Sequence, residues 1–244
     1  MPRFKIAIQY DGTQYCGWQT QKNGLAIQPV LEKILGSFSG KNSIKITGAG
    51  RTDSGVHALG QVAHFDLKTG LDTCTLKRAI NAKCPEDINI VSCNVVSPDF
   101  HARFSAVRRT YRYQCYTGTN PLYKNQSWFL PRLNIDTLNS ISKNLLGTHD
   151  FLSFSKWNKK MKNTKCDIFQ SVWTKENNMV IFTVKGDRYL HHMVRYLTGT
   201  MVAVAQNKYS KKYFIQLLSD PQKNVSLHKA PAQGLFLEKV EYVQ

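Results

Sequence analysis

The chain reads Gly48-Ala49-Gly50-Arg51-Thr52-Asp53-Ser54-Gly55-Val56-His57-Ala58-Leu59-Gly60-Gln61-Val62-Ala63-His64-Phe65 across the segment that decides its fold. Gly48, Gly50 and Gly55 surround the Arg-Thr-Asp core, so the backbone there can turn tightly and lie close to a ligand. Asp53 stands beside the fixed positive charge of Arg51, as a reactive carboxylate presented to a substrate would. The same pattern also suits an Asx-type turn, in which the aspartate bonds its own backbone. Spacing alone leaves both interpretations open.

Apolar patterns on both sides of this loop predict a mixed structure. Phe4, Ile6, Ile8 and Tyr10 alternate with other residues, which indicates a strand with one buried face. Ile44 and Ile46 indicate a strand that enters the loop, and the alternation over 62–67 indicates one that leaves it. Further strands are expected over 88–96, 109–116, 171–174, 179–184 and 235–242. Helices are expected from Pro29 onward and over 73–83, 134–146, 188–205 and 211–218.

The order of these elements predicts an α+β fold made of two β-α-β-β-α-β halves, which are ferredoxin-like units. The stretch 118–127 is rich in turn-forming residues and separates the halves. We therefore expect one half over 1–118, which carries the Asp53 loop, and a second over 119–244. On the helix expected at 188–205, four residues fall along one stripe: Arg188, His192, Arg195 and Gly199.

The charge of the chain predicts a polyanionic partner. Its 244 residues hold 33 Lys and Arg against 16 Asp and Glu, a formal charge of +17. Nucleic acid is a better match than a membrane surface. One stretch interleaves arginines, which fork onto phosphates, with aromatic rings, which stack on bases. It contains Arg103, Phe104, Arg108, Arg109, Tyr111, Arg112 and Tyr113. A second basic cluster, beside Trp157, consists of Lys159, Lys160, Lys162 and Lys165 and also suits an ordinary solvated loop.

Composition argues against several other classes of protein. Apolar runs stay shorter than the ~18 residues of a transmembrane helix, and the amino-terminal residues lack a signal-peptide pattern. The six cysteines form no C-x-x-C pair, which favours a reducing cytoplasm over a zinc or disulfide framework. The spacing of His57, His64, His101, His191 and His192 does not suit a helical zinc site, so no metal is expected.

Five segments carry a resemblance to a known family. They read Gly50-Arg51-Thr52-Asp53-Ser54-Gly55-Val56-His57-Ala58, Asp99-Phe100-His101-Ala102-Arg103-Phe104-Ser105-Ala106 with Arg109-Thr110-Tyr111-Arg112-Tyr113, Asp150-Phe151-Leu152-Ser153-Phe154, Tyr189-Leu190-His191-His192-Met193-Val194-Arg195-Tyr196-Leu197-Thr198-Gly199-Thr200 and Ala230-Pro231-Ala232-Gln233-Gly234-Leu235-Phe236-Leu237. In this order they resemble the TruA-type tRNA pseudouridine synthases over nearly the whole chain. The chain departs from the family at Thr198, where a valine is usual, and over 163–168.

The resemblance implies an isomerase that converts uridines at positions 38, 39 and 40 of the tRNA anticodon stem-loop to pseudouridine without a cofactor. It implies a homodimer that binds tRNA, and two halves whose sheets join into one extended sheet. Helices on one side and a basic cleft between the halves complete that picture. The nucleophile would be Asp53, paired with Arg195, and Tyr111 would stack on the uracil as a candidate general base. The further substrate contacts implied are Arg51, His101, Arg103 and Leu235.

The resemblance leaves open whether Asp53 attacks C1′ of the ribose, adds to C6 of the uracil or deprotonates C2′. Two other classes of function compete with it. A non-catalytic RNA-binding module would need the closely spaced aromatic residues of RRM domains, which are missing from the sequence. A metal-dependent nuclease using Asp53 and Asp66 would need more clustered carboxylates.

Overall fold

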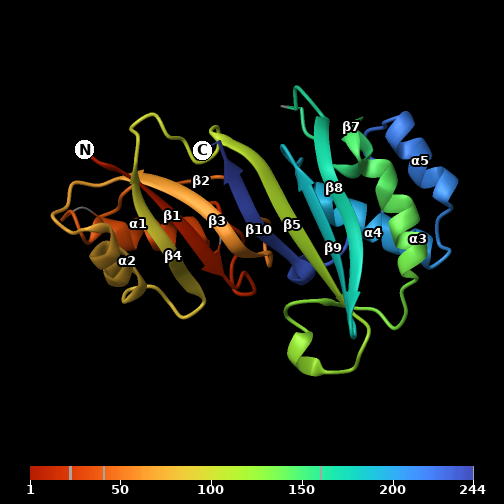
Figure 1. Ribbon diagram of the computed structural model, residues 1–244, viewed down its shortest axis with the longest axis horizontal. Coiled ribbons are helices and arrows are strands. Elements are labelled where there is room, and N and C mark those ends of the chain that lie inside the picture. The colour runs from red at the N-terminus through yellow and green to blue at the C-terminus, as the bar shows by residue number, and fades with distance from the viewer. Residues whose placement is uncertain (22–23, 41, 160, 244) are drawn as a thin grey trace. The chain divides into compact units, whose positions relative to one another are not determined.

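The computed structural model describes residues 1–21, 24–40, 42–159 and 161–243. These residues form ten strands and five α-helices, a mixed α+β structure. Contacts divide the chain into two compact units, residues 1–107 with 236–244 and residues 108–235 (Figure 1). Within the described residues, no helix combines the length and apolar character needed to cross a membrane.

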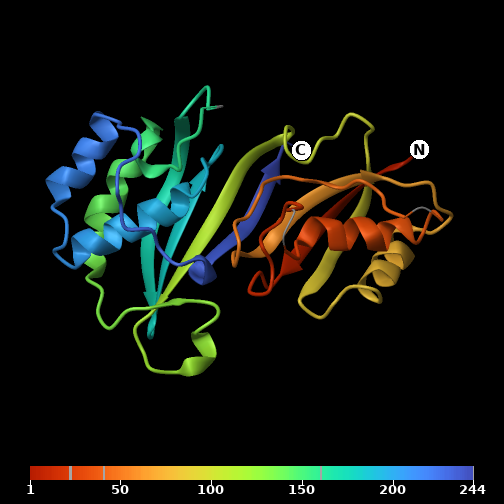
Figure 2. The same ribbon diagram turned by 180° about the vertical axis from the view of Figure 1, so that it is seen from behind.

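The first unit contains a sheet in which β1 (Arg3–Tyr10) lies between β4 (Ile88–Val96) and β3 (His57–Asp66), antiparallel to both. The other edge of β3 pairs with β2 (Thr47–Gly48) and, in parallel, with β10 (Leu235–Tyr242). Helix α1 (Ile27–Gly36) lies in front of this sheet in Figure 2, and α2 (Thr73–Asn81) contacts β4. The apolar residues at 4, 6, 8 and 10 are buried, which confirms the predicted pattern of the first strand.

The strand expected at Ile44 and Ile46 is wrong, because β2 spans only Thr47–Gly48. The reason is a competing set of hydrogen bonds. The Ile44 amide donates to the main-chain oxygen of Glu32 at 2.9 Å, and the Ile46 amide donates to its side-chain Oε1 at 3.1 Å. Helix α1 therefore holds this segment through Glu32.

The second unit has the strand order β5-β9-β8-β7, with β6 (Trp128–Phe129) parallel to β5. The strands are β5 (Ala106–Tyr116), β7 (Gly147–Asp150), β8 (Lys165–Glu176) and β9 (Met179–Gly186). Helix α3 (Ile135–Ser142) packs on β8 and α4 (Met193–Ala205), and α4 contacts α5 (Lys211–Ser219). Strand β7 had no counterpart in the sequence prediction, and β8 is longer than predicted.

The helix expected from residue 188 begins only at Met193, which corrects the predicted stripe. His192 adopts a left-handed backbone conformation, with φ at 64°, and such a residue cannot continue a right-handed helix. The Arg188 amide instead donates to Oδ1 of Asp187 at 2.7 Å. Arg188 and His192 therefore lie outside α4, whereas Arg195 and Gly199 lie on it.

The two units divide the chain differently from the expected division at residue 118. Residues 108–118 group with the second unit because β5 pairs with β9 from Arg109 to Tyr116. Residues 236–244 group with the first unit, where Phe236 pairs with His57 on β3.

Candidate functional site

The Asp53 loop joins β2 to β3 and is fixed by its buried neighbour Thr52. The Thr52 hydroxyl lies 2.8 Å from the hydroxyl of Tyr10 on β1, and both side chains are buried. The Thr52 main-chain oxygen accepts a hydrogen bond from the Trp18 amide at 3.1 Å. On the other side, the Val56 amide donates to the main-chain oxygen of Asp53 at 3.1 Å. Asp53 is half-buried, so its carboxylate stands on a backbone that is held from both ends.

A second glycine-containing loop, residues 11–18, packs against this backbone. A Cβ at Gly12 would lie 2.0 Å from the Val56 oxygen, and one at Gly17 would lie 2.4 Å from the Thr52 oxygen. Gly17 also has a φ of 102°, which L side chains rarely adopt. Sequence reasoning did not find this contact. The two glycines in Asp11–Trp18 indicate a close backbone contact, but the sequence does not identify the residues that they contact.

The strand that leaves the loop supports it with buried polar side chains. Nε2 of Gln61 donates to the Gly50 oxygen at 2.8 Å. Nδ1 of His57 lies 3.0 Å from the Gly12 amide and 3.1 Å from Oδ1 of Asp11. Burial raises the pKa of Asp11, but the hydrogen bonds from Thr13 and the nearby His57 outweigh it and lower that pKa overall. Of the predicted contacts on this loop, Arg51 is exposed.

His101 and Arg103, two further predicted substrate contacts, lie on the turn that follows β4 in the first unit. His101 is half-buried and Arg103 is exposed. The turn is anchored where the Ala102 amide donates to Nδ1 of His64 on β3 at 3.1 Å. Burial lowers the pKa of His64 to about 4, with further lowering from His101 and Arg3, so His64 accepts this bond as a neutral ring near pH 7.

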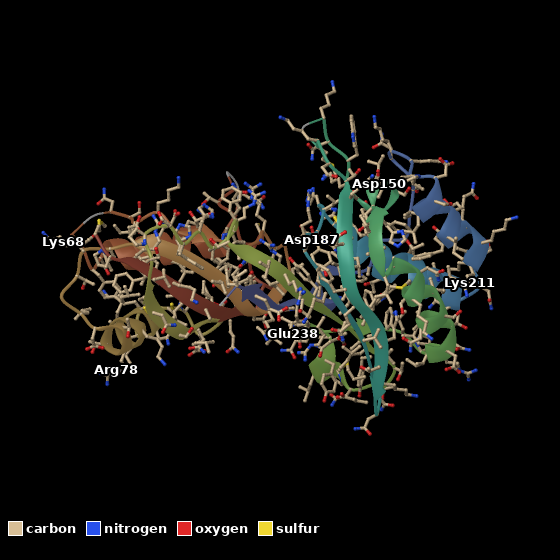
Figure 3. The ribbon with its side chains drawn as sticks, turned by 45° about the horizontal axis from the view of Figure 1, so that its top comes forward. Lys68, Arg78, Asp150, Asp187, Lys211 and Glu238 are labelled. Atoms are coloured by element: carbon tan, nitrogen blue, oxygen red, sulfur yellow. The ribbon has the colours of Figure 1, made fainter. Side chains whose placement is uncertain are left out.

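Tyr111, the predicted stacking residue, belongs to the second unit and lies on β5. Its side chain is buried, with 8% exposed, and its ring meets Tyr189 edge to face at 5.0 Å between centroids. The Tyr189 hydroxyl donates to the Arg109 oxygen at 3.3 Å, and burial raises the pKa of Tyr189 well above its usual range. Asp187, labelled in Figure 3, closes this end of β9, where its Oδ1 accepts the Asp167 amide at 2.9 Å. The ring of Tyr111 therefore packs against the Tyr189 ring.

Arg195 is half-buried on α4 and is bound twice to Ala230. Its Nε donates to the Ala230 oxygen at 2.9 Å, and its main-chain oxygen accepts the Ala230 amide at 3.0 Å. A Cβ at Gly199 would lie 2.1 Å from the His228 oxygen, so the segment before Ala230 packs directly on the helix. These contacts fix the direction in which the Arg195 guanidinium leaves the helix.

Leu235 follows the same segment and is 5% exposed. The buried Tyr113 hydroxyl donates to the Pro231 oxygen at 2.8 Å, and a Cβ at Gly234 would lie 2.6 Å from the Tyr113 ring. The second unit thus links Leu235 to β5 and Arg195 through residues 230–235. Beside the predicted basic cluster, the Trp157 ring lies 5.0 Å from Nζ of Lys223, a residue that follows α5. Lys160, a predicted member of that cluster, lies outside the described residues.

The predicted site residues therefore fall into two sets. Arg51, Asp53, His101 and Arg103 belong to the first unit, and Tyr111, Arg195 and Leu235 belong to the second. The predicted ion pair between Asp53 and Arg195 joins the two sets and stays a prediction.

A family model and two similar sequences agree on one family. A family model described as tRNA pseudouridine synthase matches residues 6–105 and 141–243. A protein named tRNA pseudouridine synthase A from Bacteroides thetaiotaomicron is 38% identical, covering 99% of this chain and 91% of that protein. One of the same name from Exiguobacterium sibiricum is 37% identical, covering 99% and 97%. Among solved structures, a chain in a crystal structure of a Cbf5-Nop10-Gar1 complex aligns at a TM-score of 0.41 and 12% identity, over 94% of this chain and 47% of that one.

Proposed function

The chain belongs to the tRNA pseudouridine synthase family, and from this premise we propose that it isomerises uridines 38, 39 and 40 of the tRNA anticodon stem-loop to pseudouridine. The observation that carries the proposal is the Asp53 loop. A half-buried carboxylate there stands on a backbone fixed by Thr52, Val56 and the glycines of 11–18. Such fixed geometry is what covalent catalysis by a carboxylate requires.

The reaction breaks the N1–C1′ bond of the uridine and forms a C5–C1′ bond. The C5 proton leaves and N1 gains one, so no electrons are exchanged and the proposal needs no redox cofactor. Asp53 is the proposed nucleophile, and attack on C1′, addition to C6 and deprotonation of C2′ all remain open for it. The target base has to leave its stack before a side chain can reach it, and this costs least in loops and at helix ends.

The remaining roles follow from chemistry and position. Tyr111 stacks on the uracil, and its hydroxyl is the proposed acceptor of the C5 proton. Arg195 is the proposed ion-pair partner of the Asp53 carboxylate. Leu235 forms an apolar wall of the pocket, while Arg51, His101 and Arg103 contact the RNA. The two hydrogen bonds between Arg195 and Ala230 support the role of Arg195 as an ion-pair partner. A guanidinium that is already positioned loses less conformational entropy when it pairs.

A direct assay tests this proposal. The protein is incubated with an unmodified tRNA transcript in EDTA, and pseudouridine is mapped by carbodiimide labelling and primer extension. We expect product at positions 38–40 with the wild-type chain and none with Asp53→Asn, which should still bind the transcript. The matched control is Asp220→Asn, which makes the same charge change at an exposed residue after α5 and should leave turnover unchanged.

Each outcome decides one part of the proposal. Normal turnover by Asp53→Asn would remove the carboxylate nucleophile, and product at other uridines would correct the position. Loss of turnover in EDTA that is restored by a divalent metal would contradict the metal-free mechanism. Light scattering of the protein, alone and with tRNA, tests the proposed homodimer. The strand order β4-β1-β3 in the first unit supports the proposal of two ferredoxin-like halves. A cytoplasmic location stays a prediction.

A further inference from the structure

The turn at residues 101–105 in the first unit presents an aromatic ring to solvent. Phe104 is 76% exposed, which is unusual for a side chain of this size. The turn that carries it is closed at both ends, because the Ser105 amide donates to the His101 oxygen at 2.9 Å and the His101 amide donates to the Ser105 hydroxyl at 3.0 Å. The turn therefore presents the Phe104 ring to solvent on a backbone that is fixed by hydrogen bonds.

Two neighbouring side chains organise the Phe104 ring. The His101 ring stacks on it at 4.3 Å between centroids with an angle of 30°, and the Arg103 guanidinium carbon lies 5.6 Å from its centroid. Nδ1 of His101 accepts the amides of Arg103 and Phe104, each at 3.2 Å. Since Nδ1 accepts, a neutral His101 carries its proton on Nε2, where it can donate.

The turn is also anchored to the core of its unit. Its central residue, Ala102, is 0% exposed. The Ala102 amide donates to His64 at 3.1 Å, and the Ala102 oxygen accepts the Tyr242 hydroxyl at 2.8 Å. The His101 ring lies 4.8 Å from the buried His64 ring and 4.3 Å from the Phe104 ring, so it connects the exposed ring to the core. The exposed ring is thus preorganised before any partner arrives.

We infer that Phe104, backed by His101 and flanked by Arg103, is a stacking platform for an unpaired base of the RNA substrate, outside the Asp53 loop. This inference rests on the proposed function, because it takes the partner to be tRNA. An aromatic face stacks on any base, and a guanidinium beside it meets the adjacent phosphate. The formal charge of +17 makes an RNA a better occupant of this surface than an apolar peptide.

Binding measurements on Phe104 variants test the inference. The affinity for a fluorescently labelled tRNA transcript is measured by anisotropy in the Asp53→Asn background, so that turnover does not interfere. Phe104→Ala should raise Kd about tenfold, since a stacked base contributes on this scale. Phe104→Tyr keeps the aromatic face and should stay within about threefold of the parent. Leu122→Ala removes another highly exposed apolar side chain, 82% exposed, and should change nothing.

The salt dependence separates stacking from charge. The slope of log Kd against log salt reports the number of phosphate contacts. Phe104→Ala removes no phosphate contact and should keep this slope, whereas Arg103→Gln removes a cation and should reduce it. An unchanged Kd for Phe104→Ala, or an equal loss for Phe104→Tyr, would overturn the platform. A change in oligomeric state without a change in Kd would assign the ring to a protein interface instead. If wild-type protein makes no pseudouridine but Phe104→Ala still weakens RNA binding, the proposed function fails and the platform stands.

Discussion

His64 gives a prediction about stability that can be worked out from its surroundings. The ring is 7% exposed, and its Nδ1 accepts the Ala102 amide, which only an unprotonated nitrogen can do. Burial lowers its pKa from 6.5 to about 4, while the unfolded chain binds a proton near the ordinary value. The unfolded state therefore holds more protons at this site between these two values, and the free energy of unfolding falls as the pH falls through that window.

The size of this effect follows from the linkage relation. A shift from 6.5 to about 4 amounts to about 3 kcal/mol once the pH is below both values. The larger part of this change falls above pH 5, where the folded state has taken up few protons at His64. The His64 contribution alone therefore lowers the free energy of unfolding by about 2 kcal/mol between pH 7 and pH 5. The chain has seven histidines, whose ordinary pKa lies in that interval, so the His64 contribution is read as the difference between the wild type and a His64 variant.

Urea unfolding at pH 7, 6 and 5 measures the prediction for the wild type and for His64→Asn. The asparagine oxygen replaces Nδ1 as an acceptor but takes up no proton. We expect the wild-type curve to fall more steeply than the variant curve, with the difference between them changing by about 2 kcal/mol. If the two curves fall in parallel, His64 titrates alike in both states and the reasoning is refuted, whatever the stability of the variant at pH 7.

Three further predictions concern the site. Gly17→Ala should lower the free energy of unfolding by about 2 kcal/mol or more and reduce turnover, because its φ is 102° and its Cβ would lie 2.4 Å from the Thr52 oxygen. Gly70→Ala, where a Cβ meets no described atom within 4 Å, is the control, and equal urea midpoints for both would contradict the packing argument. Tyr111→Phe should keep stacking but slow turnover about a hundredfold if the hydroxyl takes the C5 proton, and an unchanged single-turnover rate would exclude that role. Affinity for tRNA should fall steeply between low and moderate salt, and a flat response would mean that the charge of +17 is not used on RNA.

Local patterns predicted much of the secondary structure. The strands expected at 88–96 and 235–242 are present with those bounds, and the helix expected over 73–83 is present as α2 over 73–81. The failures arose where distant hydrogen bonds or a single backbone conformation overrode the local pattern. Glu32 holds Ile44 and Ile46 away from the sheet, and a left-handed His192 delays the start of α4. Neither the Glu32 hydrogen bonds nor the backbone conformation of His192 produces a periodic pattern of apolar residues, so the sequence does not reveal them.

The sequence by itself determined the family, the α+β class and the identity of the Asp53 loop. Those properties depend on residue types and short spacings, which a linear chain displays in full. Only the tertiary structure decided that Tyr10 bonds Thr52, that Gly12 and Gly17 pack against the loop, and that Phe104 stands exposed on a turn anchored by His64. These contacts join residues dozens of positions apart, and their partners are chosen by packing and hydrogen-bond geometry in three dimensions.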